Sequence, residues 1–199
     1  MILYIVTFLI AYLIAAINPA IVISKRVLKT DIRSLGSKNA GTTNAIRTMG
    51  KGIGALVFIL DLLKVVASYG VICFVAWIFK ENMAPSIKTL YMLASVLGHS
   101  YPVYYGFKGG KGVAVFLMSA IIVDWKMALI CIGIGVVVIA ISRMVSLGSM
   151  TGSIMLIVLD IFIATNYNFL LLLITVSIVV YNHRTNIQRI IAGQENKLF

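Results

Sequence analysis

Charged residues are scarce in this chain: 12% of its 199 residues are Asp, Glu, Lys or Arg, and 61% are hydrophobic. Soluble domains are about a quarter charged and about half apolar, so this balance excludes an ordinary soluble domain and indicates an integral membrane protein. Acidic residues are the scarcest, six against 17 basic ones, and the formal net charge is +11. No soluble basic domain or aromatic-interleaved patch carries this charge, so we expect no nucleic-acid partner.

Metal-ligating side chains are also rare. The chain has two histidines and two cysteines, and its few carboxylates are scattered without the spacing of a metal site. Cys73 and Cys131 both fall within apolar runs, where a cysteine is most simply a small core residue rather than half of a disulfide or metal pair. The sequence therefore predicts no bound metal ion and no other cofactor.

Long apolar segments are abundant. A helix needs roughly 20 apolar residues to cross a bilayer. The candidate spans are residues 2–24, 53–79, 87–97, 113–123, 127–142, 151–165 and 169–181. The first has no basic residues before it and no convincing cleavage site after it, so we interpret it as a retained helix rather than a signal peptide. We predict an all-α integral membrane protein, one domain over residues 1–199, with a bundle of seven transmembrane helices.

Basic residues lie mainly on one side of these predicted spans. Thirteen lie on one side and three on the other, and Lys64 falls within a span. The larger set is Lys25, Arg26, Lys29, Arg33, Lys38, Arg47, Lys51, Lys108, Lys111, Arg143, Arg184, Arg189 and Lys197, and the smaller is Lys80, Lys88 and Lys126. Because cytoplasmic loops carry the excess of lysine and arginine, we predict the N-terminus outside and the C-terminus in the cytoplasm.

Three polar segments interrupt the apolar chain, at residues 36–44, 98–112 and 183–186, and the predicted topology places all of them on the cytoplasmic side. They contain both histidines and the side-chain amides of Asn39, Asn44 and Asn186. Such groups need partners at membrane depth, so their convergence predicts a binding site for a polar, anionic ligand. The apolar runs beside the second segment are short, which indicates a loop that dips below the headgroups; two short helices in a thinned bilayer are the alternative.

Residues 109–112 read Gly-Gly-Lys-Gly at the start of a predicted span. Glycines let successive N–H groups face an anion, the helix N-terminus adds partial positive charge, and Lys111 adds a full charge. The segment is not a Walker A loop, because Tyr105 stands at the position of its first glycine and Gly112 at that of its Ser or Thr. A phosphate cradle and a flexible turn both remain open.

The first polar segment leads into a short stretch that contains Arg47. If Thr43 or Asn44 caps a helical turn, Arg47 lies in its first turn, near an anion bound by the free N–H groups. The alternative is an ordinary polar loop that caps a short amphipathic piece.

The third polar segment extends the last span. Asn182, Asn186 and Arg189 fall on one face of a helix, with His183 three residues before Asn186. This face either points toward the other polar segments or is the solvated end of a helix.

Two further patterns lie within the spans. Asp61 and Lys64 are three residues apart, so we expect an ion pair, either purely structural or supporting a site. Gly148 and Gly152 have the GxxxG spacing of close helix packing.

The three polar segments, in this order and spacing, resemble the signature motifs of the bacterial acyl-phosphate-dependent glycerol-3-phosphate acyltransferases. They read GSKNAGTTN, GHSYPVYYGFKGGKGVAV and HRTNIQRIIAGQE, and the resemblance covers essentially the whole chain. The first motif departs from the family at Lys38 and Thr42, where Gly and Ala are more usual. A bulky residue at position 38 would restrict the loop or add a contact.

The resemblance implies transfer of a fatty acyl group from acyl phosphate to the 1-hydroxyl of glycerol 3-phosphate, which gives lysophosphatidic acid and phosphate. It implies a multi-pass protein of the bacterial plasma membrane with a cytoplasmic active site. The expected partners are the two substrates and membrane lipid, without an obligate protein partner. The chain lacks the HxxxxD dyad of thioester-using acyltransferases, because Tyr104 and Gln188 stand five residues after His99 and His183.

Site residues follow from the same resemblance. Glycerol 3-phosphate would be held by Ser37, Arg47, Lys108 or Lys111, His183 and Asn186. The phosphate loops would comprise Asn39, Ala40, Gly41, Thr42, Asn44, Gly109, Gly110 and Gly112. The residues expected at the reaction itself are Ser37, His99, Lys111, His183 and Asn186.

Acyl phosphate is an activated mixed anhydride, so orientation and charge neutralisation can supply much of the catalysis. We expect the donor's own phosphate oxygen to accept the hydroxyl proton, with His99 or His183 as the alternative base. A transporter for a phosphorylated solute and a non-catalytic scaffold are rival functions. The lack of a matching polar segment outside argues against transport, and the cost of so many polar groups at membrane depth argues against a scaffold.

Overall fold

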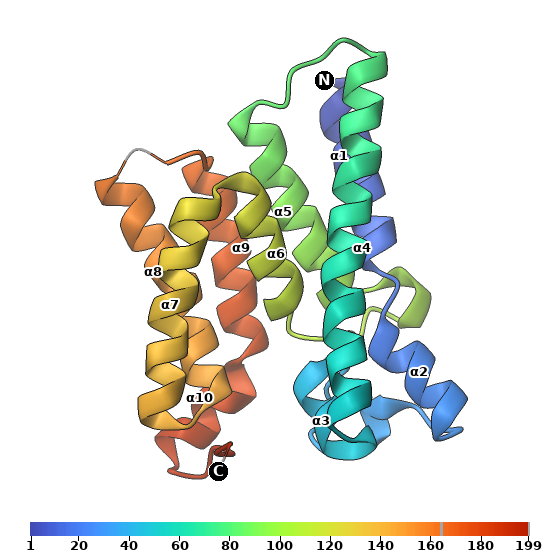
Figure 1. Cartoon of the computed structure of the whole chain (residues 1–199), viewed down its shortest axis with the longest axis vertical. Helices are drawn as coiled ribbons and strands as arrows, with labels where there is room; N and C mark the ends of the chain where they lie inside the picture. Colours follow the sequence, from blue (N-terminus) through green and yellow to red (C-terminus); the bar gives the residue numbers. More distant parts are fainter. Residues whose placement is uncertain (164, 199) are drawn as a thin grey trace.

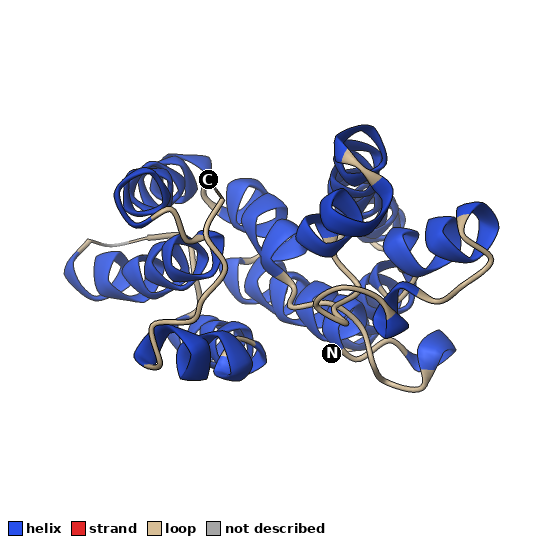
Figure 2. Ribbon diagram, turned by 90° about the horizontal axis from the view of Figure 1, so that it is seen from below, coloured by secondary structure: helices blue, strands red, loops and turns tan. Residues whose placement is uncertain are grey.

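The structure is a computed structural model that describes residues 1–163 and 165–198. These residues form helices and connecting loops only (Figure 2). The first helices are α1 (Ile2–Ala15), α2 (Pro19–Val27), the 3₁₀ helix η1 (Ile32–Ser34), α3 (Thr42–Met49) and α4 (Lys51–Ile78). Then follow α5 (Pro85–Ser100), the 3₁₀ helix η2 (Val103–Tyr105), α6 (Val113–Val123), α7 (Trp125–Ser142), α8 (Val145–Phe162), α9 (Phe169–Asn182) and α10 (Arg184–Ile191).

Each segment that the sequence predicts as a span contains an α-helix. The bounds of α6 are those predicted, and most other helices differ by a few residues at their ends. The largest difference is in α8, which begins at Val145 and ends at Phe162 instead of covering residues 151–165. Position 164 of that predicted span lies outside the described residues.

The first predicted span is broken rather than continuous. Pro19 has no N–H with which to continue the α1 hydrogen-bond ladder. Asn18 caps the second piece, because its Oδ1 accepts a hydrogen bond from the Ile21 N–H at 3.1 Å. The same side chain donates from Nδ2 to Ala40 O at 3.1 Å. The break therefore turns α2 away from the α1 axis (Figure 1) and ties it to the first polar segment.

Four helical stretches of the described chain are long and apolar enough to cross a membrane. They are Ile2–Val27, Lys51–Ile78, Trp125–Ser142 and Val145–Phe162. The pair α9 and α10, bent by 56°, makes a fifth if counted as one span. Large apolar side chains are exposed along α1, α4, α7 and α8, as on lipid-facing helices. The chain is an all-helical integral membrane protein, and its total of seven transmembrane helices stays a prediction.

The helices form two groups, with α1 to α6 on one side and α7 to α10 on the other (Figure 1). Within the first group α1 packs against α4 and α5, and α5 packs against α6. In the second group α7 packs against α8 and α8 against α9, while α5 also contacts α9 and so joins the groups. The two termini lie toward opposite ends of the long axis (Figure 1).

Glycines bring α7 and α8 into close contact. A Cβ at Gly148 would lie 2.4 Å from Gly135 O, and one at Gly152 would lie 2.9 Å from Cys131 O. Any larger residue would push the helices apart, which is the role of GxxxG spacing in membranes. The predicted close packing at Gly148 and Gly152 is confirmed. Cys131 and Cys73 are both free thiols.

Because α5 and α6 contain only 16 and 11 residues, the loop that joins them does not reach the end of the molecule. Figure 1 shows this loop near the middle of the long axis, well above α3 and α10. The fold therefore places this loop away from the end of the molecule, with His99 and Gly110 buried and Lys108 exposed.

Candidate active site

A cavity of about 330 Å³ lies between the two groups of helices, beside the N-terminus of α6. All three polar segments contribute to its lining. The predicted site residues in the lining are Ser37, Asn39, Gly41, Thr42, Arg47, His99, Lys111, Gly112 and His183. Its apolar walls come from α4, α6, α7 and the start of α8, through Phe58, Leu117, Ile139 and Val145. The cavity therefore combines a cationic, polar part with an apolar part.

The first polar segment is folded by Asn44 rather than capped by it. The prediction that Thr43 or Asn44 caps the helix is wrong: Gly41 is the N-cap of α3, and Arg47 lies in the last turn. Asn44 is buried, and its Oδ1 accepts a hydrogen bond from the Ser37 N–H at 2.9 Å. Its Nδ2 donates to the carbonyls of the preceding loop. Asn44 thus shapes the loop that presents Ser37 to the cavity.

The backbone conformation at Lys38 explains why glycine is more usual than lysine at this position of the motif. It adopts a φ of +58°, the left-handed region in which glycine is free of the Cβ penalty. Its side chain is exposed, so the loop keeps its shape at a cost of strain. Thr42, the other departure, lines the cavity, and its buried Oγ1 has no hydrogen-bond partner among the described residues.

The second polar segment uses its glycines for packing. The amides of Gly109 and Gly110 donate to Ser100 O at 3.0 Å and to His99 O at 3.2 Å. A phosphate cradle, one of the two interpretations left open by the sequence, would point both amides at an anion, but the carbonyls at the end of α5 accept their hydrogen bonds instead. A Cβ at Gly109 would lie 2.0 Å from His99 O, so only glycine permits this approach.

The N-terminus of α6 supplies the donors that remain. Gly112 is the N-cap with a φ of +85°, and no side chain among the described residues caps the helix. The first N–H groups of a helix have no partner within it and carry partial positive charge. Gly112, Val113 and Ala114 line the cavity, so this helix end faces the space beside Lys111.

Lys111 is a half-buried cation of the site, and its ammonium donates a hydrogen bond to Asn186 Oδ1. Burial lowers its pKa to about 8, the nearby Glu195 carboxylate opposes this shift, and Arg189 and Arg47 add to it. A bound phosphate would stabilise the charged form of Lys111 strongly, because it adds negative charge next to the ammonium.

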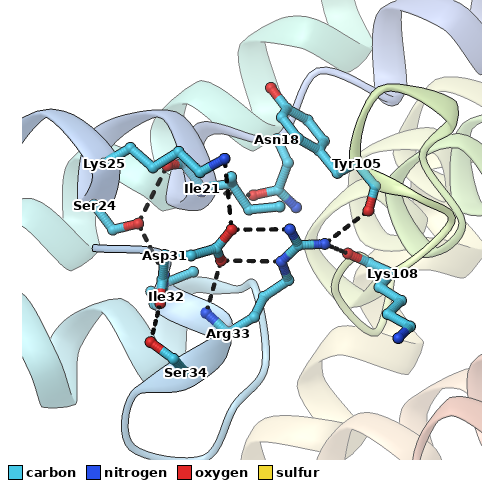
Figure 3. Close-up of polar contacts among 10 residues, drawn as sticks. All are labelled: Asn18, Ile21, Ser24, Lys25, Asp31, Ile32, Arg33, Ser34, Tyr105 and Lys108. Carbon is cyan, nitrogen blue, oxygen red and sulfur yellow. Dashed lines mark hydrogen bonds and ion pairs between the residues drawn. The ribbon is translucent and has the colours of Figure 1, made fainter. Parts of the chain in front are cut away.

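Lys108, the alternative lysine, is exposed and lies outside the lining. Its carbonyl instead belongs to a clamp that holds the loop (Figure 3). Arg33 Nη1 donates to Tyr105 O at 2.7 Å and to Lys108 O at 2.8 Å. Asp31 holds the same guanidinium through two oxygens, at 2.9 and 2.8 Å, and this pairing lowers the pKa of Asp31 to about 2. The clamp joins the chain just before the first polar segment to the second polar segment.

The third polar segment closes the cavity together with the chain after α10. Asn186 donates from Nδ2 to Glu195 Oε1 at 2.6 Å, and Arg189 Nε donates to Glu195 Oε2 at 2.8 Å. Ser146 of α8 also donates to Glu195 Oε1, at 2.7 Å. Sequence reasoning missed Glu195 and Ser146, although the glutamate lies in the third motif. A spacing pattern does not reveal a contact with a distant helix.

Asp61 and Lys64 of α4 and His99 of α5 form a polar cluster that the sequence predicted only in part. The predicted Asp61–Lys64 ion pair is confirmed at 2.8 Å. His99 joins it, with Nδ1 3.0 Å from Lys64 Nζ and 3.3 Å from Asp61 Oδ1. Asp61 and His99 also line the cavity. The sequence showed no histidine–carboxylate pair because 38 positions separate these two residues.

The structure therefore gathers most of the predicted residues but not all. Nine line the cavity directly, and Asn186 reaches it through Lys111. The predicted residues outside the lining are Ala40, Asn44, Lys108, Gly109 and Gly110. Asn44 lies in α3, and the other four belong to loops whose shape the site depends on.

Comparison with known sequences gives one family. The family model described as glycerol-3-phosphate acyltransferase matches residues 5–193. The glycerol-3-phosphate acyltransferase of Thermoanaerobacter pseudethanolicus is 42% identical over 195 residues, which cover 98% of this chain and 95% of that protein. That of Clostridioides difficile is 36% identical over 200 residues, with coverage of 98% and 95%.

Solved structures give the same result. The crystal structure of PlsY (YgiH), an integral membrane glycerol 3-phosphate acyltransferase, in its glycerol 3-phosphate form is 34% identical with a TM-score of 0.85, covering 98% of this chain and 96% of that one. Its lysophosphatidic acid form is 35% identical with a TM-score of 0.82, at coverages of 98% and 95%. The transporter and scaffold alternatives are therefore set aside: the chain belongs to the glycerol-3-phosphate acyltransferase family and is an integral membrane acyltransferase.

Proposed function

We propose that this protein transfers a fatty acyl group from acyl phosphate to the 1-hydroxyl of glycerol 3-phosphate and releases lysophosphatidic acid and phosphate. One observation carries the proposal: a single cavity has Arg47 and Lys111 beside a helix N-terminus and has apolar walls that include Phe58 and Leu117. Both substrates carry phosphate and one carries an acyl tail, so together they need both kinds of surface.

Each polar group of the cavity has a role in this proposal. Lys111 and the free N–H groups of α6 bind the phosphate on which charge develops, where charge-assisted hydrogen bonds are strongest. Arg47 and Ser37 hold the phosphate of glycerol 3-phosphate. Asn186, fixed by Glu195, orients Lys111 through its amide oxygen.

The reaction is a direct acyl transfer. The 1-hydroxyl oxygen of glycerol 3-phosphate attacks the acyl carbon, forming a C–O bond, and the bond from that carbon to the phosphate oxygen breaks. The hydroxyl proton passes to the departing phosphate, so catalysis is substrate-assisted. The protein supplies orientation and neutralises charge.

The membrane placement belongs to the same proposal. We infer seven transmembrane helices, with α1 and α2 as one span, α5 and α6 as short spans and α9 as the last. The 13 to three distribution of basic residues supports an external N-terminus and a cytoplasmic C-terminus. The cavity then faces the cytoplasm at a bacterial plasma membrane, within reach of soluble glycerol 3-phosphate and of an acyl donor dissolved in lipid.

The test is a reconstitution with the purified full-length protein. Acyl phosphate and labelled glycerol 3-phosphate should give labelled lysophosphatidic acid in the presence of a chelator, because the proposed chemistry uses no metal. Acyl-CoA should be a much poorer donor. Faster turnover with acyl-CoA, or activity that a chelator abolishes and magnesium restores, would contradict the proposal.

A further inference from the structure

Both histidines of the chain line the active-site cavity, and either could accept a proton if its ring nitrogen were free. The hydrogen-bond partners of each ring assign its tautomer, because a carbonyl can only accept and an ammonium can only donate. The two rings differ in this respect.

Lys64 determines the state of His99. Its ammonium lies 2.9 Å from Ile17 O, 2.8 Å from Asp61 Oδ1 and 3.0 Å from His99 Nδ1. Ile17 O and His99 Nδ1 have hydrogen-bond geometry to this ammonium, whereas Asp61 Oδ1 makes an ion-pair contact, so one N–H points at His99 Nδ1. A proton on Nδ1 would face that N–H at 3.0 Å, donor against donor, and Asp61 Oδ1, 3.3 Å from Nδ1, has no hydrogen-bond partner among the described residues. The neutral ring therefore carries its proton on Nε2.

The Nε2 edge of His99 points toward Gly110, in the loop that leads into α6. A Cβ built on Gly110 would lie 2.2 Å from Nε2, so the absence of a side chain at Gly110 makes room for the ring. Lys111 and Gly112, the next two residues, line the cavity together with His99. An Nε2–H group here is a fixed hydrogen-bond donor beside the proposed phosphate cradle.

His183 has the opposite arrangement. Its Nδ1 lies 2.8 Å from Val179 O, so Nδ1 carries the proton and donates to the carbonyl. In the neutral ring Nε2 is then the unprotonated nitrogen. Of the two histidines only His183 has a lone pair that is free to accept a proton.

We propose that Lys64 and Asp61 hold His99 with its proton on Nε2, so that His99 serves the reaction as a hydrogen-bond donor and not as the base. Lys64 and Asp61 are positioning residues that act through His99. The inference rests on the proposed function for the identity of the reaction, and the proton is left to the departing phosphate or to His183. The donor stabilises negative charge that develops on the substrates during transfer.

The direct test is nitrogen NMR of the ¹⁵N-histidine-labelled full-length protein in lipid, with a His183→Gln sample to assign the two rings. At neutral pH, the unprotonated nitrogen should be Nδ1 in His99 and Nε2 in His183. A proton on His99 Nδ1 would overturn the proposal. This measurement needs no turnover, so it stands even if acyl phosphate proves not to be the donor.

Kinetics with acyl phosphate test the second part of the proposal, that His99 acts as a hydrogen-bond donor in the reaction. The amide of His99→Gln can place an N–H near the Nε2 position, whereas that of His99→Asn is shorter. His99→Gln should retain kcat within roughly tenfold of wild type, the range of one neutral hydrogen bond. His99→Asn should lose about 10²–10³, as when an oxyanion donor is removed. Equal losses in both variants, with loss of the acidic limb of the kcat/KM profile, would show that His99 is a base.

A double-mutant cycle tests whether Lys64 acts through His99. Asp61→Asn with Lys64→Met removes both charges, so neither is left buried without its partner. This pair should lower kcat in the His99 background and change it little in the His99→Gln background, because coupled residues are not additive. An equal loss in both backgrounds would show a merely structural role. If the paired variant does not fold, the NMR result on the wild-type protein decides the assignment.

Discussion

Lys111 has to be charged to bind phosphate, yet burial favours its neutral form. Its pKa of about 8 in the empty site means that part of the population loses the proton within the range of ordinary assays. Phosphate binding stabilises the ammonium and raises this pKa, so binding above pH 8 takes up a proton. Affinity for acyl phosphate, whose phosphate Lys111 binds in the proposed reaction, should therefore fall as the pH rises through 8.

The measurement is kcat/KM for acyl phosphate between pH 6 and 10. We expect an alkaline limb near pH 8 in the wild-type protein. In Lys111→Arg that limb should move to higher pH, because arginine stays charged, even if the planar guanidinium lowers the overall rate. The same alkaline limb in both proteins would show that another group titrates.

Thr42 offers the cavity a hydroxyl that has no partner among the described side chains. A buried hydroxyl gains from a hydrogen bond to a ligand, and one such bond contributes about 0.5–1.5 kcal/mol. Thr42→Ala, which has the residue more usual in the family, should therefore weaken substrate binding by up to roughly tenfold. The substrate whose KM changes in steady-state assays identifies the phosphate that Thr42 contacts. Unchanged KM values for both substrates would remove Thr42 from the site.

At the scale of elements, one guanidinium ties the loop between α5 and α6 to the chain just before the first polar segment. Arg33 bonds two of its carbonyls while Asp31 fixes Arg33 from the other side (Figure 3). Arg33→Lys keeps the charge but cannot make this forked set of bonds. We expect it to loosen the loop, raise the KM for the substrate whose phosphate Lys111 binds, and lower kcat.

Hydrogen exchange over residues 101–112 measures that loosening, and Arg26→Lys on the exposed face of α2 is the matched control. Faster exchange in Arg33→Lys and not in the control is the expected result. Equal protection in the two variants, with equal activity, would contradict the clamp.

Local patterns predicted the helices well because membrane spans, glycine pairs and charge bias are properties of neighbouring residues. The helical segments, the Asp61–Lys64 pair and the close packing at Gly148 and Gly152 all follow from spacing, although spacing did not name α7 as the partner helix. The positions of Gly109 and Gly110 were foreseen, but their role was not, because their amides bond the end of α5. That bond depends on a backbone path that residue identity alone does not specify.

The parts that sequence could not predict are contacts between distant segments. Glu195 meets Ser146 across 49 positions, and Arg33 reaches Lys108 across 75. The choice between Lys108 and Lys111 was also open from spacing, and the structure places one in solvent and the other in the cavity. These are questions of three-dimensional geometry.

For the whole molecule, all three polar segments should be reached from one side of the membrane. Single cysteines at Ser37, Lys108 and Thr185 in a cysteine-free background occupy exposed positions of the three segments; Ser100 is too buried for this purpose. Impermeant thiol reagent should label them only from the cytoplasmic side. A cysteine at Asn82, in the connection from α4 to α5, is the control and should be labelled from outside. Labelling of any of the three from outside would contradict the topology.

The central claim is that the three polar segments form one site, with Lys111 bound to the phosphate that gains charge and Arg47 to that of the acceptor. Steady-state kinetics of Lys111→Ala and Arg47→Ala with acyl phosphate and glycerol 3-phosphate test it most directly, with Lys108→Ala as the exposed control. Lys111→Ala should lose about 10²–10³ in kcat, as for a contact that strengthens in the transition state. Arg47→Ala should chiefly raise the KM for glycerol 3-phosphate, and Lys108→Ala should change much less. Wild-type kinetics in both Lys111→Ala and Arg47→Ala would contradict the assigned site.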